Sequence, residues 1–410
     1  MSLPTRSDCE ALDATDPLAF ARDRFSLPPG MIYLDGNSLG ALPRATPARI
    51  ADVMAREWGE GLIGSWNEAG WMELPHRVGA RIAALIGAGA EEVVAADSTS
   101  VNLYKAVSAA VGLRPDRKVI VSEPGNFPTD LYVLQGLCEA NGLALVTTPP
   151  EGLVACLDEH VAALVLTHVH YKSGRIHDMA ALSAAAHARG ALAVWDLSHS
   201  AGALALDLNG ADADFAVGCG YKYLNGGPGA PGYIFAARRH HTAMRQPVSG
   251  WIGHAAPFSF DDCYRDADGM TRLLTGTPSV IGLAALEEGL KTFDGVAMAA
   301  VRDKSMRLSQ LFLDLVEAWL PGVFALSSPS DPAARGSQAS LRHAEGYAIV
   351  QALIAAGVVG DFRAPDVLRF GFTPLYLGYA DVFEAVERLV AIMRGGTWRE
   401  SRFSERKAVT

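Results

Sequence analysis

The chain is poor in cysteine, has no excess of basic charge and contains no long apolar run. Its five cysteines in 410 residues are scattered and form no Cys-x-x-Cys pair, so neither a disulfide framework nor a structural zinc site is expected. The net charge of −10 excludes the concentrated positive charge of nucleic-acid binders. No apolar stretch approaches the roughly 20 residues that cross a bilayer, and the first residues lack a signal-peptide core. We therefore expect a cytoplasmic protein that binds neither nucleic acid nor membrane.

Two local clusters have ordinary explanations. The basic residues Arg399, Arg402, Arg406 and Lys407 are typical of a solvated terminus rather than a nucleic-acid arm. The pair at 168 and 170 consists of histidines at alternate positions of one predicted strand end, where both side chains face the same way. Two ligands without a nearby third do not make a metal site, so no metal is expected.

The chain alternates short β-rich runs with longer Ala-rich helical patterns, such as 179–189, which ends at the C-cap residue Gly190. This alternation predicts βαβ units and an α/β fold, with a mostly parallel sheet covered by helices on both faces. Strands buried on both faces explain the nearly continuous apolar runs. Seven strands are predicted: 92–96, 118–122, 143–147, 163–167, 192–196, 215–218 and 232–235.

The pattern changes after about residue 285. A long helical stretch, 286–320, with a break near Asp294-Gly295, leads into a shorter α/β segment that ends near Arg394. The segment 327–336 is rich in Pro and Ser and predicts an exposed loop. Because 410 residues exceed what one compact core usually holds, we expect more than one domain. The predicted organisation is an N-terminal arm (1–50) that contributes to the small domain and the active site, a large cofactor-binding domain (51–285) and a small C-terminal α/β domain (286–410).

The most informative segment runs from 195 to 232. A strand ends in Asp196, His199 follows, and a Gly-rich turn then carries Tyr221-Lys222-Tyr223. Ligands of open α/β sheets bind beyond the carboxyl ends of the strands, where Asp196 and Lys222 are expected. A neutral lysine amine can form an imine with the aldehyde of pyridoxal 5′-phosphate (PLP), and an acidic residue can keep the pyridine nitrogen protonated. The plainer alternatives are a helix N-cap for Asp196 and an exposed turn lysine for Lys222.

A phosphate site is predicted where a Ser/Thr cluster follows a strand and opens a helix. The segment 97–102 has this character, and Thr99 and Ser100 would offer hydroxyls beside free backbone N–H groups. A helix-capping cluster has the same local sequence, so this signal is weak on its own.

The run from Asp196-x-x-His199 to Tyr221-Lys222-Tyr223-Leu224-Asn225-Gly226-Gly227-Pro228-Gly229 resembles the cofactor segment of kynureninases. This family belongs to the fold-type I, aspartate aminotransferase-like PLP enzymes. Five motifs match in order, and the resemblance spans roughly residues 30–390. The other four motifs are 34–40 (LDGNSLG), 126–130 (NFPTD), 250–254 (GWIGH) and 368–376 (LRFGFTPLY).

The resemblance implies a seven-stranded sheet, PLP bound to Lys222 and a homodimer with active sites at the subunit interface. Simpler roles stay open for several side chains, such as core packing, interface packing, a structural salt bridge or a turn. The implied contacts are Phe127 stacked on the pyridine ring, Asp130 and His199 beside it, Asp196 on its nitrogen, Thr99, Ser100, Tyr221 and Trp251 on the phosphate, Thr277 reaching the phosphate from the partner subunit, Thr167 as an addition, Arg369 on the substrate carboxylate, and Ser38 and Asn37 near the substrate.

The implied reaction is hydrolytic cleavage of the Cβ–Cγ bond of L-kynurenine or 3-hydroxykynurenine, which gives anthranilate or 3-hydroxyanthranilate and L-alanine. Lys222 would act as the base at Cα, and Tyr221 would assist at Cβ. The alternatives are a class V aminotransferase and a cysteine desulfurase-like PLP enzyme. A persulfide-forming desulfurase needs a cysteine on a mobile C-terminal loop, whereas this chain has none after Cys263.

Overall fold

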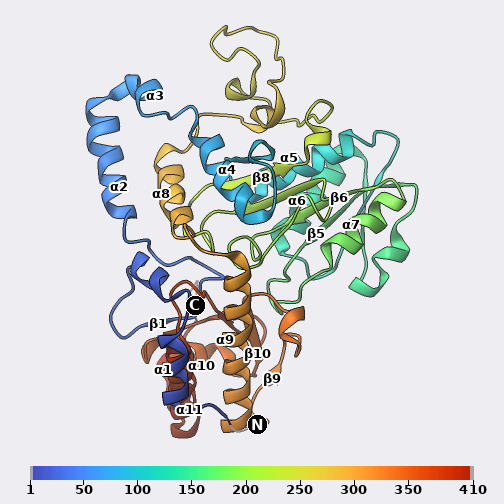
Figure 1. Cartoon of the computed structure of the whole chain (residues 1–410). Helices are drawn as coiled ribbons and strands as arrows, with labels where there is room; N and C mark the ends of the chain where they lie inside the picture. Colours follow the sequence, from blue (N-terminus) through green and yellow to red (C-terminus); the bar gives the residue numbers. More distant parts are fainter. Residues whose placement is uncertain (1–2, 407–410) are drawn as a thin grey trace.

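The computed structural model describes residues 3–406 and is built around a seven-stranded sheet of order β2-β8-β7-β6-β5-β3-β4 (Figure 1). The pairs from β4 to β7 are parallel, whereas β8 is antiparallel to both of its neighbours. The predicted α/β fold and mostly parallel sheet are therefore confirmed. The strands are β2 (Val93–Ala95), β3 (Val119–Ser122), β4 (Ala144–Thr147), β5 (Val161–Thr167), β6 (Leu192–Asp196), β7 (Phe215–Cys219) and β8 (Gly232–Ala236).

Helices cover both faces of this sheet because alternate residues of each strand point to opposite sides. In β2, Val93 and Ala95 pack into one apolar core and Val94 into the other. The first core also holds α4 (Leu74–Ile86), α7 (Met179–Ala188) and α8 (Val280–Lys291), and the second holds α5 (Thr99–Gly112) and α6 (Pro128–Asn141).

A second, four-stranded antiparallel sheet of order β12-β13-β10-β9 lies below the first in Figure 1. Gly295, at φ 72°, lies between α8 and the next helix, where the sequence predicts a break. The predicted smaller α/β unit after the large sheet is therefore present. Its elements are α9 (Met298–Trp319), β9 (Ala325–Leu326), β10 (Gln338–Arg342), α10 (Gly346–Ala355), β11 (Val358–Val359), β12 (Asp361–Arg363), β13 (Val367–Gly371) and α11 (Tyr379–Gly395).

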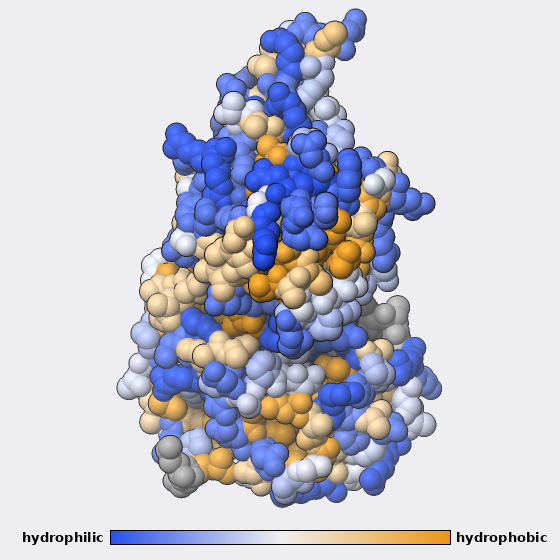
Figure 2. Space-filling view, turned by 90° about the vertical axis from the view of Figure 1, so that its right-hand side faces the viewer, coloured by the Kyte–Doolittle hydropathy of each residue, from blue (hydrophilic) through white to orange (hydrophobic). Residues whose placement is uncertain are grey.

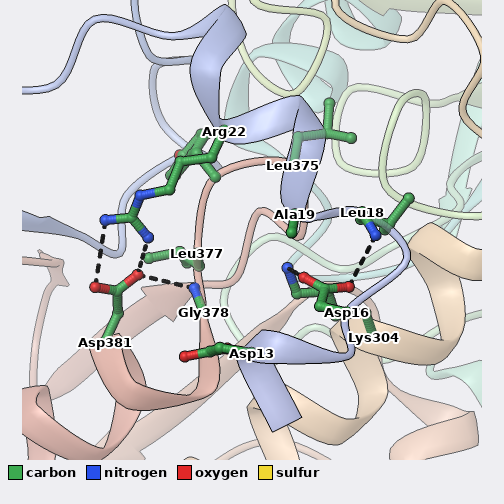
Figure 3. A pocket seen from close by; sticks show the side chains of 11 residues that line it. Asp13, Asp16, Leu18, Ala19, Arg22, Lys304, Leu375, Leu377, Gly378 and Asp381 are labelled. Carbon is green, nitrogen blue, oxygen red and sulfur yellow. Dashed lines mark hydrogen bonds and ion pairs between the residues drawn. The ribbon is translucent and has the colours of Figure 1, made fainter. Parts of the chain in front are cut away.

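The N-terminal arm packs against this smaller unit. Its helix α1 (Arg6–Ala14) lies beside α11, and its strand β1 (Ile32–Tyr33) pairs in parallel with β11. The Asp13 carboxylate accepts hydrogen bonds from the backbone N–H groups of Tyr379 (2.6 Å) and Ala380 (3.0 Å) at the start of α11. Nearby, Lys304 Nζ lies 2.5 Å from Asp16, and Arg22 pairs with Asp381 (Figure 3). These polar contacts attach the arm to the smaller unit.

The C-terminal tail is partly packed rather than wholly solvated. Phe403 is buried, and the guanidinium of Arg406 lies 5.4 Å from the ring centre of Tyr347. The aliphatic and planar parts of such side chains can cover apolar surface while the charge stays hydrated. Lys407 lies outside the described residues.

Two segments project from the body and carry exposed apolar side chains. The first comprises α2 (Thr46–Asp52), the π-helix 53–60 and α3 (Ser65–Glu68), and the second is the loop at about 254–266 (Figure 1). Figure 2 shows that loop at the top of the molecule and a broad apolar area near the middle of the same face. None of the helices in residues 3–406 combines the length and the apolar character needed to cross a bilayer. The most exposed apolar side chains of these segments are Trp58, Leu62, Ile63, Phe258 and Phe260.

Replacing Asp13 by Ala should lower the free energy of unfolding by about 1 kcal/mol, because two N–H groups at the start of α11 lose their acceptor. The urea midpoint, followed by circular dichroism, measures this change. Asp23→Ala is the matched control, since the Asp23 side chain is exposed and accepts no hydrogen bond among the described residues. Equal midpoints for the two variants would show that the arm does not cap α11.

Candidate functional site

The candidate site lies at the carboxyl ends of three neighbouring strands. Thr167 ends β5 and is paired with Asp196, which ends β6. The chain leaves β7 at Cys219 and enters the Gly-rich turn that carries Lys222. Parallel strands end at the same edge of a sheet, which is where α/β proteins bind ligands. The fold therefore brings together Thr167, Asp196 and Lys222, which are 26 to 55 positions apart in the chain.

The backbone of the lysine turn is held by the N-terminal arm. The Gly40 N–H donates to the Tyr221 carbonyl oxygen at 2.8 Å. A Cβ atom at Gly40 would lie 2.3 Å from the Lys222 carbonyl oxygen, so only glycine allows this approach. Gly40 closes the motif 34–40, and this contact gives that motif a physical role at the site.

The Lys222 amine lies among one histidine and two aromatic rings. Its Nζ is 3.0 Å from His199 Nε2 and 5.8 Å from the ring centres of both Phe127 and Tyr221. Phe127 is the N-cap residue of α6 and is 37% exposed, although it is apolar. Its ring lies edge-on to Tyr171, with centres 5.3 Å apart. An exposed ring beside a lysine offers a flat surface for another ring, whereas simple core packing does not account for its exposure.

Two carboxyl groups are buried beside this amine. Asp196 accepts hydrogen bonds from the backbone N–H (2.8 Å) and the hydroxyl (2.6 Å) of Ser198. Asp130 accepts one from the Thr167 hydroxyl at 3.1 Å. Burial, followed by the charge of Asp196, raises the pKa of Asp130 well above its usual range, and burial also raises the pKa of Asp196. Like charges in a dry site disfavour each other, so a cationic donor next to Asp196 would stabilise its ionised form.

His199 is buried and lacks one hydrogen-bond partner. Burial, then the positive charge of Lys222, lowers its pKa well below the usual value, so the ring is neutral. Its Nδ1 has no hydrogen-bond partner among the described residues. Buried polar atoms are nearly always paired in native structures, so this nitrogen indicates a ligand contact.

The start of α5 has the features of an anion-binding site. Thr99 and Ser100 form its first turn, where backbone N–H groups have no partner within the helix. The preceding Asp97 has φ 48° and accepts a hydrogen bond from the buried Lys105 at 2.6 Å. A Cβ at Gly232, which pairs with the end of β7, would lie 2.9 Å from the Thr99 nitrogen. The predicted phosphate end is thus next to the strand that leads to Lys222.

Two further predicted phosphate ligands lie in the segment between β8 and α8. Trp251 packs edge-on against Trp66 and Phe258, with ring centres 6.4 and 5.9 Å away. Thr277 lines a cavity together with Asp97. Asp97 lies shortly before the start of α5, so this cavity borders the predicted phosphate end. The phosphate contacts of Trp251 and Thr277 stay predictions.

A second polar group lies on the smaller sheet. Arg369, in β13, is buried and pairs with Asp361 of β12, with Nε 2.7 Å from Oδ1. It also donates to the Tyr171 carbonyl oxygen (2.6 Å) and to the Ser38 hydroxyl (3.1 Å). Arg369 thus forms a structural salt bridge, which was the simpler alternative to a role in binding the substrate carboxylate. Asn37 is fully buried and its amide has no partner among the described residues.

Sequence reasoning did not identify Asp361 or its neighbour Arg363. Asp361 lies opposite Arg369 only because β12 and β13 pair antiparallel in that register. The alternation Asp361-x-Arg363 on one strand face was the available signal. His168 and His170 bind different partners, the Ser200 hydroxyl (2.9 Å) and the Gly125 carbonyl oxygen (2.9 Å). Within residues 3–406, no cluster of three metal-ligating side chains was found.

Comparisons with known proteins place this geometry in a family. The family model described as "Kynureninase C-terminal domain" matches residues 301–389. A kynureninase of Pseudomonas fluorescens is 49% identical over 416 residues, covering 100% of both chains. Among solved structures, a cysteine desulfurase from Thermococcus onnurineus has a TM-score of 0.77 at 18% identity, covering 96% of this chain and 98% of its own. A C-DES variant with glycine covalently linked to its PLP cofactor has a TM-score of 0.75 at 16% identity, covering 94% and 99%.

The two structural likenesses show the fold alone, because both identities are low. The sequence match to the Pseudomonas fluorescens kynureninase shows the family, since nearly half of all residues are identical over the full length of both chains. The resemblance to kynureninases is therefore confirmed, and the chain belongs to the kynureninase family.

Proposed function

We propose that the protein is a PLP-dependent hydrolase that cleaves the Cβ–Cγ bond of L-kynurenine, or of 3-hydroxykynurenine, to anthranilate or 3-hydroxyanthranilate and L-alanine. The observation that carries the proposal is the position of Lys222 Nζ, beside His199, Phe127 and the buried Asp196, in a chain 49% identical to a kynureninase. The alternative of a persulfide-forming desulfurase is disfavoured, because no cysteine follows Cys263.

The residues fit PLP. Lys222 would hold it covalently, Phe127 would stack on its ring, and Asp196 would accept a hydrogen bond from the ring nitrogen. The unpaired Nδ1 of His199 and the free N–H groups at the start of α5 are further polar atoms that such a ligand would satisfy. When bound, PLP supplies an aldehyde that joins an amine and a ring that accepts electrons.

The side chains of the site would carry out proton transfer and would orient the substrate. Lys222, once free as an amine, takes the proton from Cα of the substrate. Tyr221 keeps its own proton, because burial raises its pKa well above the usual value, so its hydroxyl can donate to the phosphate or supply a proton at Cβ. Asp130 and Asp196 would stabilise the protonated pyridine ring of the cofactor. Arg369 would orient the substrate carboxylate. Water adds to the aryl carbonyl carbon, and collapse of the resulting diol releases the aryl acid.

We also propose a cytoplasmic homodimer with active sites at the subunit interface. All five cysteines are unpaired, which agrees with a reducing compartment. The projecting helices carry Trp58 and Ile63 with 57% and 80% exposure, and exposed apolar groups of this kind mark interfaces. The partner subunit would bring Thr277 to the phosphate, and Trp251 would donate its indole N–H there.

Lys222→Ala should abolish anthranilate production from L-kynurenine, because the amine that holds the cofactor and removes the Cα proton is lost. The assay follows anthranilate fluorescence with PLP present, and borohydride reduction followed by peptide mass spectrometry locates the pyridoxyl label. Lys118→Ala, at an exposed position, is the control and should retain both activity and label. Substantial turnover by Lys222→Ala, or a label on another residue of the native protein, would refute this role.

Ile63→Asp should shift the protein from dimer toward monomer, because it places a charge in the apolar surface that the partner would cover. Sedimentation velocity measures the change. Val154→Asp is the matched control, since Val154 is equally apolar and 56% exposed but lies on a different segment. If both variants sediment like the native protein, the helical projection is not the interface.

A further inference from the structure

One buried carboxylate lies between two arginines at the substrate end of the site. Asp361 Oδ2 is 2.7 Å from Arg363 and also pairs with Arg369. The same oxygen accepts a hydrogen bond from the Ser38 hydroxyl at 2.6 Å. Both arginines therefore meet at Ser38, a residue of the N-terminal arm. The two guanidinium groups differ in how many of their donors are still free.

Arg369 has almost no donor left for a ligand. A guanidinium has five N–H groups. In Arg369, Nε and Nη2 face Asp361, Nη2 also reaches Ser38, and Nη1 donates to the Tyr171 carbonyl oxygen. A bidentate grip on a carboxylate needs two parallel N–H groups. Arg369 can provide them only by giving up a contact that it already makes.

Arg363, in contrast to Arg369, keeps most of its hydrogen-bond donors free. Its Nη2 is its only nitrogen with an acceptor among the described residues, in contact with Asp361 and 3.5 Å from the Ser38 hydroxyl. Its side chain is 38% exposed, whereas that of Arg369 is 2% exposed. The charge of Arg363 also acts on the cofactor end of the site, since it contributes to the lowered pKa of His199, after burial, Lys222 and Arg369.

The charges of this cluster favour an added anion. Although burial opposes it, the hydrogen bond and charge of Arg369 and the charge of Arg363 lower the pKa of Asp361, which is therefore ionised. Burial, and then the charge of Asp361, raises the pKa of the neighbouring Asp35 to about 7. Near neutral pH the two arginines thus face the ionised Asp361 and a partly ionised Asp35, and a substrate carboxylate would offset the positive charge that remains.

We propose that Arg363 is a second binding residue for the substrate α-carboxylate, which it grips through its free Nε and Nη1 groups while Asp361 holds both arginines in place. This inference rests on the proposed function and deepens it. Arg369 then acts as a fixed, buried charge beneath the carboxylate, and Arg363 supplies the exposed donors that the ligand meets first.

Arg363→Gln should raise the KM for L-kynurenine roughly ten-fold or more, with kcat changed by less than about three-fold, because a charge-assisted pair with the carboxylate is lost from binding. The inhibition constant of kynurenamine, which is kynurenine without its carboxylate, should change by less than about two-fold. Arg363→Lys should recover part of the loss, since it keeps the charge but not the fork of donors. The absorbance change of the PLP-loaded protein on titration with L-alanine gives an affinity that does not depend on turnover, and it should weaken in parallel with kynurenine.

The matched control is Arg342→Gln. Arg342 occupies the same rung of the sheet as Arg363, on the other side of Val367, and likewise pairs with an aspartate, Asp366. The Arg342→Gln substitution should leave the KM, the kcat, the inhibition constant of kynurenamine and the affinity for L-alanine unchanged. An unchanged KM and alanine affinity in Arg363→Gln, or equal weakening of kynurenine and kynurenamine, would overturn the proposal. Native protein that forms no anthranilate would refute the proposed function instead, and the alanine titration would still test Arg363.

Discussion

The contact on which the site depends is the approach of the N-terminal arm to the lysine turn. The Gly40 N–H holds the Tyr221 carbonyl oxygen, and the absence of a side chain at Gly40 lets the two backbones meet. The same arm carries Ser38 to the two arginines of the smaller sheet and is attached to α11 through Asp13. One segment therefore joins the lysine on the large sheet to the arginines on the small one, and a shift of the arm would change both ends of the substrate pocket together.

The chemistry of the site comes from burial as much as from residue type. Asp130, Asp196 and His199 are ordinary titratable side chains, but removal of water raises the pKa of both carboxyls and lowers that of the imidazole. These shifted groups lie next to an amine whose neighbours are aromatic. A cation beside the two carboxyls would favour their ionised forms.

Much of the fold was predictable because local patterns and the tertiary structure agree. The seven strands of the large sheet appear with ends shifted by at most two residues, since strands buried on both faces are marked by continuous apolar runs. The candidate site was predictable for a similar reason: Asp196 ends β6, Lys222 comes three residues after the end of β7, and parallel strands end at one edge of the sheet. Asp361 and Arg363 could not be predicted in this way, because their roles depend on antiparallel register and on contact with an arm more than 300 residues earlier.

The sequence by itself determined the fold class and the resemblance to the kynureninase family, and it predicted Lys222 as the imine-forming lysine with Asp196 as its acidic partner. These inferences follow from patterns within short segments and from the order of five motifs along the chain. Only the tertiary structure decided which donors of Arg369 are already occupied, that Arg363 is more exposed than Arg369, and that the Lys222 amine lies beside His199. Those properties depend on distances and burial among distant segments, and no local pattern records either.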